Sequence, residues 1–107
     1  MKTGIELIAE ERQKQIEKHG FTAEHHALND RWYDNDQLQL AAHSLLAPEL
    51  YEQAEVYDNL PNNWDQEKWN NLCNKPQKER LIIAGSLISA ELDRLNYLAE
   101  NNTTGRV

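Results

Sequence analysis

The chain has 107 residues, a formal net charge of −7, 39% hydrophobic residues and one cysteine. This length suits one domain, the acidic balance argues against a broad contact with duplex DNA or RNA, and a single cysteine excludes a disulfide within the chain. No apolar run approaches membrane-span length and no signal-peptide core follows the N-terminus, so we expect a cytoplasmic protein without a membrane partner.

The N-terminal residues carry clear helix signals. Thr3 and Glu6 have the spacing of a capping box, and Gly20 is a natural residue to follow a helix end, so we expect a helix to about His19. Its inner face is expected to consist of Ile5, Ile8, Ala9, Arg12 and Ile16. Because Arg12 lies on this apolar side, its guanidinium is expected to meet a carboxylate.

Residues 21–35 have the composition of a polar loop. A second helix is expected over residues 37–47, with Asp34 or Asp36 as its N-cap and an apolar face behind it. Pro48 cannot continue that helix, but it suits the first turn of another, so residues 48–57 are expected to form a short third helix.

The next stretch, residues 58–76, is rich in Asn, Asp and Pro and is expected to be an irregular connector. A connector this long usually contains a helical turn or a functional site, and residues 65–72 are the segment that we expect to be helical. Pro76 then opens the last helix.

The last helix, residues 79–100, has the longest apolar period in the chain. Its core-facing stripe is expected to consist of Leu81, Ala84, Ile88, Leu92, Leu95 and Ala99. Glu91 lies among apolar neighbours, so its carboxylate needs a cation, a donor or a proton. A salt bridge to Arg94 or to another helix, a metal or ligand contact, and simple exposure all stay open.

No segment alternates with the period of a strand, so the sequence predicts an all-α fold. We expect a small bundle of three main helices plus short ones. It should form one domain over residues 1–100, followed by a frayed tail at residues 101–107.

Acidic residues occur on both terminal helices. The candidates are Glu6, Glu10, Glu11 and Glu17 on the first helix, with Glu79, Glu91 and Asp93 on the last. Facing helices of a bundle are a usual place for a carboxylate site for magnesium or manganese. The alternative is that these side chains form solvated faces.

Histidines and tryptophans supply the other candidates. His25 could contact a phosphate, whereas His43 has no ligand partner one turn away, so zinc has little support. Trp64 and Trp69, with Lys68, Lys75 and Arg80 nearby, could stack on a base and hold a phosphate, or the two indoles could simply cover the helical core.

Together these segments resemble small phage and prophage proteins related to the all-α, MazG-like nucleotide pyrophosphohydrolases. The resemblance rests on residues 4–16, 18–22, 24–25 and 38–42, on Trp64, Trp69 and Lys75–Pro76, and on residues 84–88 and 90–95. It implies an all-α fold, usually a homo-oligomer, with a pocket for a small nucleotide. For a phage-encoded chain it implies a place in the host cytosol.

The resemblance also implies a site. In active members an E-x-x-E pair and an E-x-x-D pair hold magnesium while water attacks between the α and β phosphates. Here Glu6 and Glu10 are four residues apart, and Ile82 stands where the second pair would place Asp. For an enzyme, Glu10, Glu11 and Glu91 would hold the magnesium ion and carry catalysis. Ligand contacts are expected from Arg12, Gln15, His25, Trp64, Trp69 and Lys75.

Three functions therefore stay open at the level of the sequence. The first is a magnesium-dependent nucleoside triphosphate pyrophosphohydrolase. The second is an inactive protein that sequesters a nucleotide, such as a host immune signal captured for a phage. The third is a helical protein-interaction module.

Overall fold

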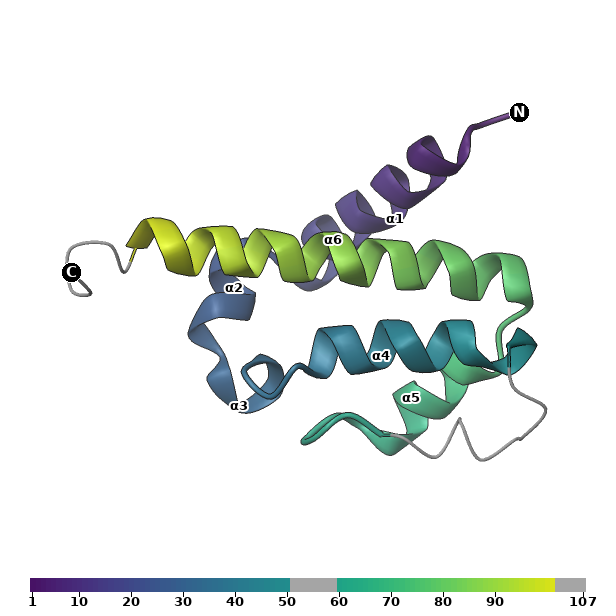
Figure 1. The fold of residues 1–107 in the computed structure, drawn as a ribbon. Coiled ribbons are helices and arrows are strands. Elements are labelled where there is room, and N and C mark those ends of the chain that lie inside the picture. Colours follow the sequence, from purple (N-terminus) through teal and green to yellow (C-terminus); the bar gives the residue numbers. More distant parts are fainter. Residues whose placement is uncertain (51–59, 102–107) are drawn as a thin grey trace.

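The structure is a computed structural model that describes residues 1–50 and 60–101 (Figure 1). Every regular element in these two ranges is helical, which confirms the predicted all-α class. The elements are α1 (Gly4–His19), α2 (Ala23–Leu28), α3 (Asp30–Tyr33), α4 (Gln37–Leu46), the 3-10 turn η1 (Ala47–Glu49), α5 (Gln66–Cys73) and α6 (Gln77–Asn101). Most of the third helix expected at residues 48–57, and the tail from residue 102, lie outside the described residues.

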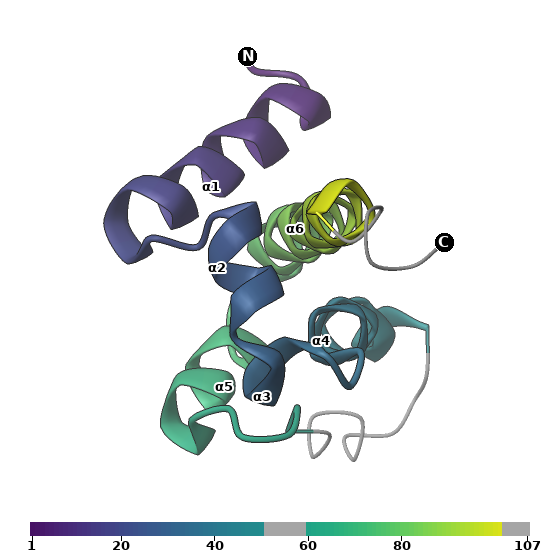
Figure 2. The ribbon, with the colours of Figure 1, turned by 90° about the vertical axis from the view of Figure 1, so that its left-hand side faces the viewer.

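The long helix α6 is the axis of the fold. In Figure 1, α4 runs antiparallel beside it, and α1 crosses it obliquely. Figure 2 looks along α6 and shows α1, α2 and α4 arranged around it, with α5 and α3 farther away. Helices α1, α2 and α4 pack directly on α6, so the side chains of α6 link both halves of the chain.

Helix α1 begins and ends as its sequence predicts. Both hydrogen bonds of the capping box are present, between Thr3 and Glu6, and Gly20 adopts a left-handed conformation with φ of 68°. The buried Arg12 donates to the carbonyl oxygen of Phe21 at 2.6 Å and lies 3.3 Å from a carboxylate oxygen of Asp93. The expected carboxylate partner of Arg12 is therefore confirmed.

The prediction of a loop over residues 21–35 was wrong, because α2 and α3 occupy it. Thr22 is the N-cap of α2, and its hydroxyl accepts from the backbone N–H of His25 at 3.1 Å. At the other end, the Asn29 side chain donates to the carbonyl oxygen of His25 at 2.7 Å. A helix of six residues is too short to show an apolar period, so its cap was the one sequence signal for it, and the prediction did not use that signal.

Asp36 occupies the N-cap position of α4, but it does not cap the helix in the expected way. Its φ is 59°, and its side chain makes no capping hydrogen bond. The buried Gln37 acts locally instead, since its Oε1 accepts from the backbone N–H of Asn35 at 2.7 Å.

The predicted core stripe of α6 was largely wrong. Ala84 is buried, but Leu81, Ile88, Leu92 and Leu95 are 47–57% exposed, and Ala99 is exposed as well. The buried face instead carries Ile83, Ala84, Leu87, Ala90, Glu91 and Arg94. Helix α6 has two apolar faces, and α4 and α2 pack on the one with more small residues, where helices can approach closely.

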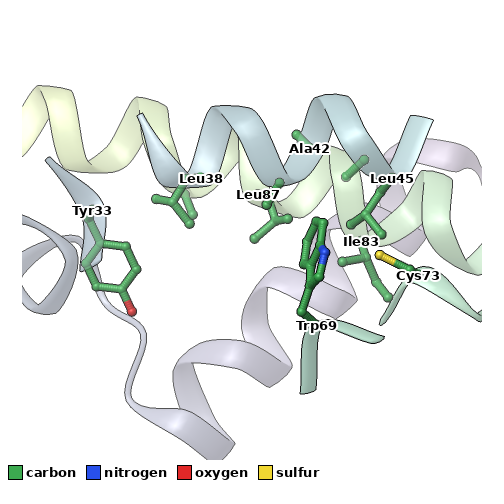
Figure 3. Close-up of a cluster of buried hydrophobic side chains, with 11 residues drawn as sticks. Tyr33, Leu38, Ala42, Leu45, Trp69, Cys73, Ile83 and Leu87 are labelled. Atoms are coloured by element: carbon green, nitrogen blue, oxygen red, sulfur yellow. The ribbon is translucent and has the colours of Figure 1, made fainter. Parts of the chain in front are cut away.

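Trp69 of α5 is the largest side chain of the core, at 1% exposed. Figure 3 shows its indole beside Leu45, Ile83 and Leu87, with Cys73 nearby. Burial raises the pKa of the Cys73 thiol to about 11, so the sulfur stays protonated at neutral pH. Helix α5 begins at the N-cap Asp65, which confirms the helical segment predicted in the connector.

Helix α1 approaches α6 closely at Gly85. A Cβ at this position would lie 2.6 Å from Cδ1 and 2.9 Å from Cγ1 of Ile8. We therefore expect Gly85→Val to destabilise the fold by about 1–3 kcal/mol, measured by urea unfolding, because Ile8 must leave its place between the helices. Shortening the opposing side chain in the double variant Ile8→Ala/Gly85→Val should recover part of that loss; a neutral single variant would contradict the close contact.

Candidate ligand-binding cavity

A cavity of about 760 Å³ lies between the C-terminal half of α1, the α2–α3 segment and α5. Its aromatic lining consists of Phe21, His25, His26, Trp32, Tyr33, Trp64 and Trp69. Its polar lining consists of Glu11, Gln15, His19, Asn63, Asp65, Lys68 and Asn71, and Leu38, Leu72, Ile83 and Leu87 complete the wall. This volume is within the range of sites that enclose small organic ligands.

The aromatic rings form a continuous series along the cavity. Phe21 stacks on His25 with centroids 5.5 Å apart, and His26 meets Tyr33 edge-on at 4.5 Å. The series continues from Tyr33 to Trp64 at 6.5 Å and from Trp64 to Trp69 at 6.2 Å. The wall therefore offers planar apolar surface at several orientations.

Two side chains of the loop before α5 donate hydrogen bonds to backbone carbonyl oxygens of α3. The Trp64 indole N–H donates to the carbonyl oxygen of Trp32 at 3.0 Å, and the Asn63 amide donates to that of Arg31 at 2.8 Å. These bonds fix Trp64 while part of its ring stays accessible, because the residue is only partly buried.

His26 contributes a buried nitrogen without a hydrogen-bond partner to the cavity wall. It is 2% exposed, and its Nδ1 has no hydrogen-bond partner among the described residues. Burial, reinforced by the positive charges of Arg12 and Arg94, lowers the pKa of His26 to about 4. At neutral pH the imidazole is uncharged, and its unpartnered Nδ1 is itself buried in the wall.

The charges of the lining nearly balance. Lys68 is the fixed cation, and the carboxylates are Glu11 and Asp65. Glu11 is 2.9 Å from the ammonium group of Lys14, and Asp65 accepts from the Lys68 backbone as the α5 cap. A ligand that carries little net charge therefore suits this wall better than a highly charged one.

Five of the residues predicted for the site do line this cavity, drawn from both ends of the sequence. They are Glu11, Gln15, His25, Trp64 and Trp69. Gln15 is buried and donates to the Ser86 hydroxyl at 2.8 Å. Trp69 is almost wholly enclosed by the core, so Trp64 and Phe21 have more free ring surface to offer.

The other predicted ligand residues have partners elsewhere. Arg12 is held by Phe21 and Asp93, and Lys75 lies 3.8 Å from the carboxylate of Glu79. Neither residue lines the cavity. The buried Arg80, considered for phosphate, instead donates to the carbonyl oxygen of Leu45 at 2.8 Å and binds a carboxylate of η1.

The three carboxylates expected to hold magnesium do not gather. Glu10 pairs with Lys2 near the N-terminus, and Glu91 accepts two hydrogen bonds from Arg94, at 2.7 and 3.0 Å. The latter is the salt bridge that the sequence allowed for Glu91. Across the described ranges, no three His, Cys, Asp or Glu side chains are placed to hold a metal ion. The described residues as arranged do not fit a magnesium site, and magnesium binding stays a prediction.

Sequence reasoning missed much of the aromatic wall. Phe21, His26 and Tyr33 were assigned to a loop, and the wall exists because α2 packs on α6 and α3 packs beside α2. The Thr22 cap was the one local signal for this. Nothing in the sequence alone places Tyr33 beside Trp64, because that contact joins distant segments.

Fold and cavity together define the class, an all-α protein with an aromatic-lined cavity. Comparison with family models, with curated proteins and with solved structures gave no match to this chain. Among the described residues, no helix combines the length and apolar character needed to cross a membrane.

Proposed function

We propose that this protein binds a small nucleotide in the aromatic cavity and holds it without cleaving it. The observation that carries the proposal is the wall of rings around about 760 Å³, reached by polar side chains from α1 and α5. Stacking of a base on an aromatic ring contributes about 1–3 kcal/mol to binding. Phe21 and Trp64 are best suited to this contact, since both rings are only partly buried.

The rest of the wall would then select the ligand. Lys68 would meet a phosphate. Because Glu11 and Asp65 offset this cation, a nucleotide with one or two charges, such as a cyclic nucleotide, is favoured over a triphosphate.

Capture is favoured over hydrolysis because Glu10 and Glu91 are each engaged by a basic side chain. With the phage-like resemblance, this supports a sequestering role, in which the protein removes a nucleotide signal of the host's defence. The resemblance also leads us to propose a homo-oligomer. Binding itself needs the cavity of only one chain.

A thermal-shift screen tests this proposal. Nucleoside triphosphates and cyclic nucleotides are each added with magnesium and with a chelator, and the ligand is recovered after every positive shift. We expect a raised midpoint that does not depend on magnesium, and a ligand recovered unchanged. Recovery of monophosphate and pyrophosphate would establish the hydrolase instead, and no shift with any nucleotide would exclude both.

Lys68 is the most direct single test of the phosphate contact. We expect Lys68→Ala to weaken binding of the nucleotide found in the screen by roughly tenfold or more, because a charge-assisted hydrogen bond contributes about 1.5–3 kcal/mol. Isothermal titration measures the change. Lys78→Ala is the matched control, since Lys78 is an exposed α6 lysine outside the cavity. Equal affinities for the two variants would contradict the assigned role.

A further inference from the structure

One flank of α6 carries large apolar side chains in contact with solvent. Leu81, Ile88, Leu92 and Leu95, here called the apolar face of α6, are 47–57% exposed. Figure 2 shows α1, α2 and α4 on the other sides of this helix, and within the described ranges no helix covers the remaining flank. Exposed apolar surface of this extent usually marks a contact with another molecule.

The apolar face continues onto α1. A groove of about 350 Å³ runs between the two helices, lined by Ile5, Ile8, Ala9, Arg12, Gln13 and Ser89. Ile5, at its outer end, is 82% exposed, and Figure 1 shows the first turns of α1 projecting beyond α6. Face and groove therefore form one surface with room for side chains from a partner.

The area of this surface matches half of a stable dimer contact. The four side chains of the apolar face and Ile5 are 47–82% exposed, which leaves roughly 500 Å² of apolar area per chain for a partner to cover. A standard interface buries about 800 Å² per partner, of which a little over half is apolar. One copy of the chain thus supplies about the apolar area that a symmetric contact requires.

We propose that a second copy of the chain covers this surface, with the two α6 helices packed antiparallel about Ile88. Leu81 and Leu95 lie seven residues to either side of Ile88. An antiparallel pair therefore places Leu81 of one chain beside Leu95 of the other. The same arrangement brings Lys78, near the start of α6, toward Glu100 at the far end of the partner helix. Parallel packing would bring like charges together instead, and antiparallel helix dipoles also attract.

This inference assigns a contact surface to the homo-oligomer of the proposed function, and in that respect it rests on the proposed function. The dimer does not depend on nucleotide binding. The cavity uses Ile83 and Leu87 of α6, whereas the dimer uses the opposite flank. Dissociation should therefore leave ligand affinity unchanged. A dimer that binds no nucleotide would contradict the proposed ligand alone, and a monomer that binds one would contradict only this inference.

The first test measures mass in solution by light scattering after gel filtration. We expect the wild-type chain at twice the mass of its 12.5 kDa protomer, and Ile88→Asp at the protomer mass with unchanged helical circular dichroism. Leu28→Asp is the matched control, because Leu28 is an exposed leucine on α2, away from the apolar face, and this variant should remain a dimer. A monomeric wild type, or a dimer that survives Ile88→Asp, would overturn the proposal.

The second test reads the direction of the helices. In an antiparallel pair, an equimolar mixture of Leu81→Cys and Leu95→Cys chains forms mixed disulfides on oxidation, and neither variant cross-links well alone. Cys73 can stay in place, since it is buried in the core. Efficient cross-linking of Leu95→Cys with itself would contradict the antiparallel arrangement.

Discussion

Trp69→Ala is expected to cost about 3–5 kcal/mol of the free energy of unfolding, a large share of the ~5–15 kcal/mol typical of a small domain. The indole fills the space between α5, α4 and α6, as Figure 3 shows, and truncation leaves a cavity that these helices cannot close without shifting toward one another. Urea unfolding followed by circular dichroism measures the loss.

Trp32→Ala provides the control for this substitution. Trp32 is the same residue type, but it is 39% exposed on α3, so its removal should change stability far less. A comparable loss for both variants would mean that the enclosed position of Trp69 does not determine its contribution.

Acid should destabilise the protein through His26. The folded chain binds a proton at this residue only near pH 4, whereas the unfolded chain binds it near pH 6.5. Between these values the unfolded state holds more protons, so stability falls as the pH drops through this window, by up to about 3 kcal/mol from this group. Above pH 6.5 both states are neutral at His26 and the effect is absent.

His26→Leu isolates this contribution, because every other titrating group is shared with the wild type. The wild-type free energy of unfolding should fall more steeply than that of the variant between pH 6.5 and 4. Titration of the imidazole by NMR gives a direct reading. Protonation of the folded chain near pH 6.5 would contradict the buried, unpartnered state of the ring.

The helix ends of this fold follow from local chemistry, and for that reason the sequence predicts them. The capping box at Thr3, the left-handed Gly20 and the start of α6 after Pro76 depend on neighbouring residues alone. The all-α class follows from the absence of strand-like alternation along the sequence. The ion pairs of Arg12 and Glu91 were also predictable, since a charge on an apolar face needs a partner.

The orientation of α6 was not predictable in the same way. Two apolar faces compete for the core, and the sequence pattern favours the one with more leucines. The structure buries the face whose Ser86 and Ala90 let other helices approach, and it leaves Leu81 and Leu92 exposed. Close backbone packing decides this choice, and hydrophobic periodicity does not report it.

Part of the candidate site was likewise predictable. Gln15, His25 and Trp64 were identified by residue type and by resemblance, and they converge on the cavity. Lys68 lines the cavity and Lys75 does not, because Lys68 lies within α5 whereas Lys75 follows the end of that helix. Such a choice requires the three-dimensional arrangement of α5 against α1.

The three tryptophans of the chain offer the most direct test of the cavity as the ligand site, because Trp32, Trp64 and Trp69 all line it. An NMR spectrum of the protein with ¹⁵N-labelled tryptophan contains three indole N–H signals, recorded before and after adding the nucleotide found in the thermal-shift screen. Binding in the cavity should shift the Trp64 signal most, with smaller changes at Trp32 and Trp69. A saturating nucleotide that leaves all three signals in place would show that it binds elsewhere and would contradict the account.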